Sequence, residues 1–446
     1  MTEWSVLAVP SPSLVLMVGP SGSGKTTFCR RNFPAASVIS SDDCRAAISG
    51  DPADQSATPA AFALAHERLE ARLRRRRLAV LDATSLTPHA RAAALDLAAR
   101  HHLPAVAIVL DVPPEVCARH DATRPDRRRV GRRVIEEHAR DLRGALEALP
   151  REGFRAIHHL RGAPPPDDLT VALEPLPCDR SSDSGPFDII GDVHGCLREL
   201  RLLLERLGYR RPTPRAPYAH PRGRRAVFLG DLVDRGPRIV ETARLAMAMA
   251  AAGSALCVPG NHDAELASIL RGEAPDGPPG PGTLRSLAQI EAAAQRGRRF
   301  GRSFASFVGS LPAHLLLDGG RLAVAHAGLR AEYIGRDSQV VRRFALFGEN
   351  TGDVDRYGLP VRVNWARGYA GRTFVVYGHT PVPRPEAIGN TLNIDTGCVY
   401  GGALTALRWP ERRTVVVRAP RIYYRSPRTR RLGIGIRART RYEPTA

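Results

Sequence analysis

Short apolar runs alternate with helical patterns along the first 160 residues of the chain. The expected strands are Ser13–Gly19, Ala36–Ser40, Leu78–Asp82, Ala105–Leu110 and Ala156–Leu160, and the expected helices are Lys25–Asn32, Ala61–Arg77, Pro88–Arg100 and Arg132–Leu149. Such alternation is typical of a mostly parallel sheet covered by helices on both faces. We therefore expect an α/β domain over residues 1–160.

A second set of elements follows a break in this pattern. Residues 161–186 are rich in Pro, Ser, Asp and Gly, so we expect a linker there. The next expected strands are Phe187–Gly191, Ala226–Gly230, Ala255–Pro259, Arg321–His326, Thr373–Gly378 and Ala403–Arg408, with helices at Leu197–Leu207, Arg238–Ala251 and Leu284–Arg296. They predict an α/β domain built on a β-sandwich over residues 187–418.

Two stretches of the second half are expected to be irregular. Gly272–Gly282 is packed with Pro and Gly and is predicted to be a mobile surface loop. Residues 419–446 are rich in Arg and have little apolar periodicity, which predicts a basic tail that is partly disordered or forms an arm.

Length and composition indicate a globular protein with more than one core. The chain has 446 residues, of which 43% are hydrophobic. It contains neither a run of about 20 apolar residues nor a secretion signal, so we expect a cytoplasmic location and no membrane partner. Its seven cysteines lack paired spacing, which argues against a disulfide framework and a zinc cluster.

The charge is strongly positive. A formal net charge of +20 favours polyanionic partners such as nucleic acid, although a general enrichment in Arg would explain part of it. Lys25 is the only lysine in the sequence. Every other cation is Arg or His, so position 25 requires a compact ammonium on a flexible stem.

That lysine belongs to a phosphate-binding loop. The pattern follows an expected strand and opens an expected helix, which is the context in which backbone N–H groups cradle phosphates. Its members are Gly19, Pro20, Ser21, Gly22, Ser23, Gly24, Lys25, Thr26 and Thr27. We expect Lys25 to bridge the terminal phosphates of ATP and Thr26 to help hold Mg²⁺.

Two carboxylates and three arginines are candidates to complete this site. Asp42 follows the second expected strand, where it would activate an attacking hydroxyl or merely cap the next helix. Asp82 ends the third strand, where it would act through metal-bound water or be another cap. Arg119, Arg124 and Arg127 would close over the transferring phosphoryl group, or lie on the surface of an Arg-rich chain.

Five short motifs follow in order in the second half. They are GDVHG from Gly191, GDLVDRG from Gly230, GNHD from Gly260, His326 in AHAG, and GHT from Gly378. Each follows an expected strand, so their side chains should converge at one edge of a sandwich and hold two metal ions about 3.5–4 Å apart.

We assign these residues to three tasks. Asp192 and His194 would hold one metal, Asp231 would bridge, and Asn261, His326 and His379 would hold the other. His262 would protonate the leaving oxygen with support from Asp234, and Arg235 would grip the phosphate. Manganese, nickel and iron all fit such ligands, and Mn²⁺ is the expected one.

The second half resembles the calcineurin-type metallophosphoesterases, and the whole chain resembles bacterial polynucleotide kinase-phosphatase. The kinase likeness rests on GPSGSGKTTF, VISSDDCR, LDATS with Ser85 in place of the usual Asn, LPAVAIVLDVPPEVC and RPDR. The phosphatase likeness rests on the five motifs and on NIDTGCVYGG. The resemblance implies that Asp42 is the kinase base and that Asp395 joins the phosphatase site.

The family generally carries a third, nucleotidyltransferase-like domain, and this chain has no Lys-x-Asp-Gly motif. We therefore expect any sealing to require a separate ligase or repair partner. Our leading hypothesis is an enzyme that phosphorylates a 5′-hydroxyl end and clears a 2′,3′-cyclic or 3′ phosphate on RNA or DNA. The alternatives are a diadenosine tetraphosphatase-like enzyme fused to a small-molecule kinase, and an ATP-driven regulatory module beside a protein phosphatase.

Overall fold

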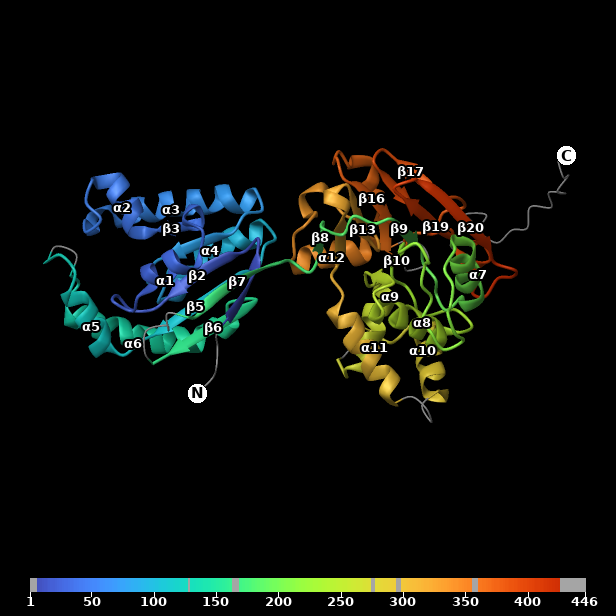
Figure 1. Cartoon of the computed structure of the whole chain (residues 1–446), viewed down its shortest axis with the longest axis horizontal. Coiled ribbons are helices and arrows are strands. Elements are labelled where there is room, and N and C mark those ends of the chain that lie inside the picture. Colours follow the sequence, from blue (N-terminus) through green and yellow to red (C-terminus); the bar gives the residue numbers. More distant parts are fainter. Residues whose placement is uncertain are drawn as a thin grey trace. The chain divides into compact units, whose positions relative to one another are not determined.

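The computed structural model describes residues 6–126, 129–162, 168–273, 277–293, 298–354 and 360–425. It divides into two compact units, the first comprising Met1–Leu176 and Gly335–Ser338, the second Pro177–Ile334 and Gln339–Ala446. Figure 1 shows the chain coloured along its sequence. Among the described residues, no helix is both long and apolar enough to cross a membrane.

The first unit is built on a five-stranded parallel sheet. Its strand order is β3-β4-β2-β5-β6, and every neighbouring pair is parallel. The strands are β2 (Leu14–Val18), β3 (Val38–Ser40), β4 (Ala79–Asp82), β5 (Ala105–Asp111) and β6 (Ala156–Arg161). The helices are α1 (Lys25–Asn32), α2 (Ser41–Ser49), α3 (Thr58–Arg74), α4 (Pro88–Arg100), α5 (Pro114–Ala122) and α6 (Arg132–Ala148).

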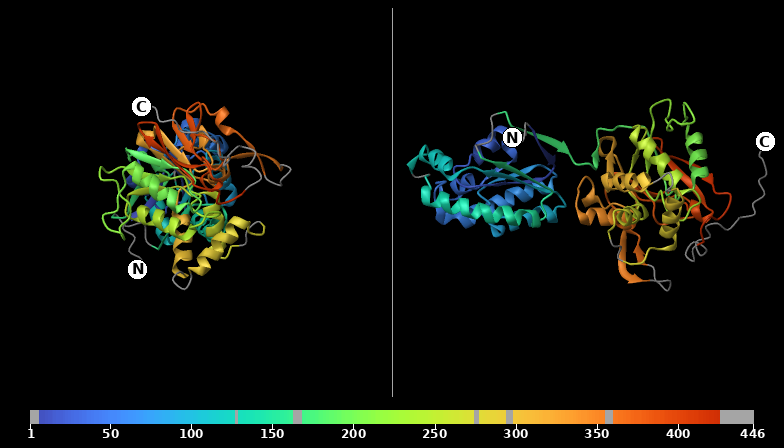
Figure 2. Two further views of the ribbon diagram at one scale, coloured as in Figure 1. Left: turned by 90° about the vertical axis from the view of Figure 1, so that its right-hand side faces the viewer. Right: turned by 90° about the horizontal axis from the view of Figure 1, so that it is seen from below.

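Both faces of this sheet are buried, which explains its continuous apolar strands. Along β5, Val106 and Ile108 pack with Phe28 of α1, whereas Ala107 and Val109 pack on the opposite face with Leu142 of α6. Successive side chains of a strand point to opposite faces, so β5 contributes side chains to two hydrophobic clusters, one on each face of the sheet. The right-hand view of Figure 2 shows this unit, in blue to teal, from below.

The expected linker is shorter than predicted. A second, two-stranded parallel sheet pairs β1 (Val6–Ser11) with β7 (Thr170–Pro175), and β8 (Asp179–Arg180) pairs with a strand of the second unit. Both β7 and β8 lie inside residues 161–186. They were missed because each is completed by a partner strand far away in the sequence, which local composition cannot reveal.

The second unit is a sandwich of two mixed sheets. Their orders are β11-β10-β9-β19-β20 and β17-β18-β16-β13-β12-β8. The strands of the first are β9 (Phe187–Ile190), β10 (Arg225–Phe228), β11 (Ala255–Cys257), β19 (Ala403–Trp409) and β20 (Arg413–Arg418). Those added by the second are β12 (His314–Leu317), β13 (Leu322–Ala325), β16 (Phe374–Tyr377), β17 (Glu386–Ile388) and β18 (Thr391–Asn393).

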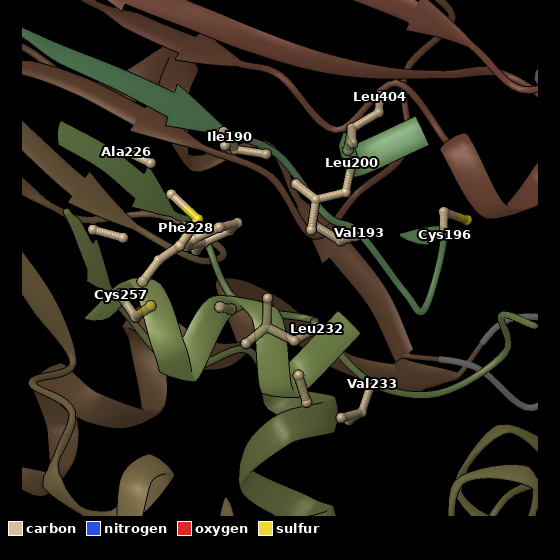
Figure 3. Packing of buried hydrophobic residues seen from close by; sticks show 14 of the residues in the cluster. Ile190, Val193, Cys196, Leu200, Ala226, Phe228, Leu232, Val233, Cys257 and Leu404 are labelled. Carbon is tan, nitrogen blue, oxygen red and sulfur yellow. The ribbon is translucent and has the colours of Figure 1, made fainter. Parts of the chain in front are cut away.

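Helices cover the outer faces of the sandwich. They are α7 (Leu197–Leu207), α8 (Ile239–Ala251), α9 (Asn261–Leu270), α10 (Pro281–Ala292), α11 (Arg298–Ser310) and α12 (Gln339–Phe347), and a hairpin joins β14 (Glu349–Val354) to β15 (Pro360–Val363). Ile189 of β9 packs with Val324 of β13 between the sheets, whereas Ile190 packs with Leu200 of α7 on the outer face. Figure 3 shows part of this outer cluster.

The predicted fold class is therefore confirmed, with corrections at its irregular stretches. The expected loop Gly272–Gly282 ends earlier because Pro281 begins α10, a position where the missing N–H costs nothing; residues 274–276 lie outside the described part. Of the expected tail, only residues 419–425 are described. There the backbone N–H groups of Tyr423 and Tyr424 donate to the carbonyl oxygen of Val399, so this stretch packs on the second unit.

Candidate active sites

The phosphate-binding loop joins β2 to α1, and two of its glycines are required by close approaches. Gly22 has a φ of 81°, and a Cβ there would lie 2.3 Å from the carbonyl oxygen of Cys117. A Cβ at Gly19 would lie 2.7 Å from the carbonyl oxygen of Leu110. Any side chain at either place would displace the backbone of a neighbouring element.

Lys25 lies inside this loop. Its Nζ donates to the carbonyl oxygens of Gly19 at 2.9 Å and Pro20 at 2.8 Å, and the residue is only 8% exposed. Burial lowers the pKa of Lys25 to about 8, although the nearby charge of Asp82 acts in the opposite direction. The ammonium is therefore held by two backbone oxygens that carry no full charge, and its own charge can act on a phosphate.

Asp82 ends β4 beside the loop. Its side chain is buried, and its carboxylate accepts a hydrogen bond from the hydroxyl of Thr26. Its Oδ2 has no hydrogen-bond partner among the described residues. Burial raises the pKa of Asp82, a cost that a bound cation would remove. A buried carboxylate with an unpartnered oxygen beside a hydroxyl suits Mg²⁺, so Thr26 and Asp82 fit a magnesium site.

The helix after β3 is capped by Ser40 rather than by Asp42. Ser40 Oγ accepts hydrogen bonds from the backbone N–H groups of Asp42 at 3.2 Å and Asp43 at 3.3 Å. The Asp42 side chain is 66% exposed and pairs with Arg45. The negative charge of Asp42 raises the pKa values of both Lys25 and Asp82, so Asp42 lies at the same sheet edge as these two residues. Its carboxylate is not used by the helix cap.

The arginine candidates are placed unequally. The positive charge of Arg124 contributes to lowering the pKa of Lys25, and Arg124 forms an ion pair with Asp121 at 3.4 Å. Arg119 is exposed on α5, and Arg127 lies outside the described residues.

Two histidines that the sequence analysis missed contact the loop. His120 Nδ1 lies 2.9 Å from the carbonyl oxygen of Gly22, and His138 Nδ1 accepts from the N–H of Ser21 at 3.3 Å. Nothing in the sequence marks either as a loop contact, because both come from helices about 100 residues or more further along the chain.

In the second unit, three parallel strands from each sheet end at one place. Asp192, Asp231 and Asn261 follow β9, β10 and β11 of one sheet. His326, His379 and Asp395 follow β13, β16 and β18 of the other. The structure thus brings together all six residues, since carboxyl ends of parallel strands share an edge.

The backbone around these residues is strained. Five residues other than glycine have φ values in the left-handed region: His194 (43°), Asp231 (47°), Asp234 (68°), Arg235 (66°) and His379 (69°). Each such residue costs of order 1–3 kcal/mol, which a fold retains where it fixes functional side chains. All five are candidates that the motifs had indicated.

The histidine rings are oriented by backbone carbonyls. His194 Nδ1 contacts the carbonyl oxygen of Val233 at 2.7 Å, which turns Nε2 to within 3.3 Å of Asp231 Oδ2. His326 Nδ1 contacts the carbonyl oxygen of Leu229 at 2.9 Å, and its Nε2 lies 3.0 Å from His379 Nδ1. Burial lowers the pKa of His194 to about 4, so its ring is neutral, as a metal ligand must be.

The carboxylates also fit metal binding. Asp192 is buried, and its Oδ2 accepts from the N–H of His379 at 3.0 Å. Within the described part of the chain, its Oδ1 has no hydrogen-bond partner. A Cβ at Gly378 would lie 2.2 Å from that Oδ1, and one at Gly260 would lie 2.1 Å from Asp231 Oδ1. Ligand atoms of His194, Asp231 and His262, and of Asp231, His326 and His379, lie within 4.8 Å of one another in two groups that share Asp231.

A model of the calcineurin-like phosphoesterase family matches residues 185–415, which is more than half of the chain. The chain belongs to this family. A model of an AAA domain matches residues 14–149, in the first unit.

Known relatives of the phosphoesterase are named asymmetrical bis(5′-nucleosyl)-tetraphosphatase PrpE. The protein of that name from Anoxybacillus flavithermus is 42% identical over 234 residues, which are 52% of this chain and 93% of that protein. Those from Geobacillus thermodenitrificans and Bacillus subtilis are 44% and 40% identical, with the same shares covered.

Beside the metal candidates, the phosphoesterase holds a hydrogen-bonded chain of His262, Asp234 and Arg235, which we call the relay. His262 Nδ1 lies 2.6 Å from Asp234 Oδ2, and Arg235 contacts Nε2 of His262 as well as Nε2 of His194, the latter at 2.6 Å. Burial alone would raise the pKa of Asp234, but the hydrogen bond to His262 and the positive charge of that histidine outweigh it, so the pKa is lowered. Burial raises the pKa of Asp395 to about 6, and the N–H of Gly397 donates to its Oδ1.

Several residues that support this site were not identified from the sequence. Asp263 accepts backbone N–H bonds from Leu232, Val233 and Gly260, and thereby ties two of the motif loops together. Asp263 is the last residue of the GNHD motif, so the sequence contained a signal that could have identified it.

Arg362 is the other such residue on the metal side. It donates to the carbonyl oxygen of His379 at 3.2 Å and to Thr380 Oγ1 at 2.7 Å, beside a cavity of about 130 Å³.

Proposed function

We propose that this chain heals broken nucleic-acid ends, in the manner of the polynucleotide kinase-phosphatases that it resembles. The first unit would be an ATP-dependent kinase for 5′-hydroxyl ends, and the phosphoesterase would remove 2′,3′-cyclic and 3′ phosphates. The observation that carries the kinase half is the exposed Asp42 carboxylate, which Ser40 leaves free of capping beside the loop that holds Lys25.

In the kinase reaction, Asp42 accepts the proton of the 5′-hydroxyl as its oxygen attacks the γ-phosphorus of ATP. The bond from that phosphorus to the oxygen of ADP breaks, and Lys25 binds the charge that develops on the phosphates. Thr26 and Asp82 would hold Mg²⁺, which neutralises phosphate charge when bound. Arg124, with Arg119 and Arg127, neutralises the phosphoryl group.

In the phosphoesterase reaction, two divalent metals supply water activation and charge stabilisation when bound. Asp192 and His194 would hold one, Asn261, His326 and His379 the other, with Asp231 between them and Asp395 alongside. Manganese is the proposed ion because oxygen and imidazole ligands are mixed here.

The remaining residues handle the proton and the phosphate. Asp234 stabilises the doubly protonated imidazolium of His262 through Nδ1–H. Nε2–H then gives its proton to the leaving oxygen, which leaves His262 neutral with its remaining proton on Nδ1. Arg235 binds the phosphate oxygens through its planar guanidinium.

The proposed substrates are strand ends of RNA, or of DNA, because a net charge of +20 favours a polyanion over a small metabolite. A kinase and a phosphatase in one chain would waste ATP on a common position, so we assign them to opposite ends. Sealing would then fall to a separate ligase.

A second candidate is hydrolysis of dinucleoside tetraphosphates. The relatives named PrpE favour it, since they match about half of this chain at 40% identity or more. It concerns the phosphoesterase alone and leaves the kinase proposal unchanged.

Substrate preference separates the two candidates. The full chain should be assayed with Mn²⁺ on a 3′-phosphate oligoribonucleotide, a 2′,3′-cyclic phosphate oligoribonucleotide and diadenosine tetraphosphate. We expect the higher kcat/KM on an oligoribonucleotide, and we expect Asp231→Ala to lose hydrolysis of all three of these substrates. A higher kcat/KM on diadenosine tetraphosphate would replace end healing by the second candidate.

A further inference from the structure

The stretch after β20 returns to the phosphoesterase site. The N–H of Ala419 donates to the carbonyl oxygen of Gly402 at 2.9 Å. The N–H groups of Tyr423 and Tyr424 both donate to the carbonyl oxygen of Val399, at 3.0 and 2.9 Å. Val399 lies in the short turn Cys398–Tyr400, four residues after Asp395. The stretch is therefore anchored to the loop that carries a site residue.

This anchoring places two aromatic rings beside Arg235. The guanidinium carbon of Arg235 lies 5.6 Å from the ring centroid of Tyr400 and 6.0 Å from that of Tyr424. The two rings meet edge to face with centroids 6.2 Å apart. Burial raises the pKa of Tyr400, so its hydroxyl stays neutral and its ring acts as an uncharged face for the cation.

We propose that Tyr424, together with Tyr400, is a positioning residue that holds the Arg235 guanidinium for phosphate binding. A long arginine side chain has many rotamers, and two ring faces favour those that keep the guanidinium beside Tyr400 and Tyr424. The inference rests on the proposed phosphate-binding role of Arg235.

The neighbouring tyrosine provides a matched control. Tyr423 packs against the same hydrophobic cluster as Tyr424, but its hydroxyl donates to Glu199 Oε1 at 2.9 Å. Its ring contacts the guanidinium of Arg421 at 5.3 Å instead. Loss of the Tyr423 ring should thus weaken the same stretch without acting on Arg235.

The test measures KM and kcat of the full chain for p-nitrophenyl phosphate with Mn²⁺, and the inhibition constant of inorganic phosphate. Tyr424→Leu should raise KM and the phosphate inhibition constant by about three- to tenfold, with kcat little changed. Tyr424→Phe keeps the ring and should restore both values. Tyr423→Leu should lower the melting temperature and leave KM unchanged.

Three outcomes overturn the inference, and they are distinguishable. If Arg235→Ala raises KM but Tyr424→Leu does not, the tyrosine is only part of the core and the role of Arg235 stands. If Arg235→Ala itself leaves KM and phosphate inhibition unchanged, the proposed role of Arg235 fails together with that of Tyr424. Equal KM increases in Tyr424→Leu and Tyr423→Leu would also contradict it, because they would indicate a general loss of packing.

Discussion

Lys25 is buried, donates to two carbonyl oxygens and is the only lysine in an arginine-rich sequence. Its single Nζ atom donates to the carbonyl oxygens of both Gly19 and Pro20, a geometry that suits a compact ammonium rather than a planar fork. With a pKa lowered to about 8, Lys25 is charged at neutral pH but loses its proton in mildly basic solution. ATP affinity is then linked to pH through this one residue.

Nucleotide binding should take up a proton in basic solution. Bound phosphates favour the charged ammonium, so at about pH 9 the free protein must gain a proton at Lys25 on binding, whereas at about pH 7 it already carries one. As pH rises above 8, ATP affinity should fall, by at most about tenfold per pH unit. Calorimetry of Mg-ATP binding in two buffers of different ionisation enthalpy measures the uptake.

Lys25→Met is the control and should show no uptake at either pH. Equal proton uptake in wild type and Lys25→Met at about pH 9 would refute this account of Lys25.

Among single residues, the sequence identifies those that belong to a motif and misses those that are distant from it along the chain. The P-loop and the five phosphoesterase motifs identify Lys25, Asp192 and Asp231 because each motif is local. His138 and Tyr424 could not be found in this way, since only the tertiary fold brings them to their sites.

The start of α2 separates two roles that the sequence left open. Ser40 satisfies the first backbone N–H groups of the helix, and Asp42 remains outside the cap. Capping and catalysis should therefore fail in different variants.

Ser40→Ala should lower the free energy of unfolding of the first unit by about 1 kcal/mol, the usual cost of a lost N-cap. Asp42→Ala should leave that free energy within about 0.5 kcal/mol of wild type and abolish phosphate transfer to a 5′-hydroxyl. Urea unfolding and a transfer assay with labelled ATP provide the two readouts. Should Asp42→Ala destabilise the unit as much as Ser40→Ala while transferring phosphate normally, Asp42 is a cap and not the base.

The start of α10 supports the relay of the phosphoesterase. Thr283 Oγ1 donates to Asp234 Oδ2 at 3.1 Å, and the hydroxyl of Ser286 donates to Oδ1 while its oxygen accepts from the N–H of Asp234 at 3.1 Å. A helix that the sequence places only approximately thus fixes the carboxylate behind His262.

Ser286→Ala should lower kcat for p-nitrophenyl phosphate by about tenfold, because it frees the carboxylate that orients His262. Ser286→Thr keeps the hydroxyl and should retain more activity. A nearby substitution without contact to Asp234, Leu284→Ala at an exposed position, controls for damage to α10. Equal kcat values for Ser286→Ala and wild type would show that the relay does not need this support.

Element prediction succeeded where an element is defined by its own residues. The apolar runs of β2, β5 and β9 and the patterns of α1 and α7 were found because burial on one or both faces leaves a local signature. Strands β1, β7 and β8 have weak patterns and depend on distant partners, and so the expected linker was drawn too long.

At the scale of the whole molecule, one chain carries two phosphoryl-transfer sites in separate compact units. The phosphate-binding loop forms the first site, and the residues that follow six converging strands form the second. Because the described candidate residues of each site belong to a single unit, we expect the two activities to be lost independently.

The most direct test uses an oligoribonucleotide with a 5′-hydroxyl and a 3′-phosphate, incubated with ATP, Mg²⁺, Mn²⁺ and the full chain as wild type, Asp42→Ala or Asp231→Ala. We predict that wild type phosphorylates the 5′ end and clears the 3′ end, that Asp42→Ala loses only the first activity, and that Asp231→Ala loses only the second. If wild type leaves both ends unchanged, end healing is contradicted.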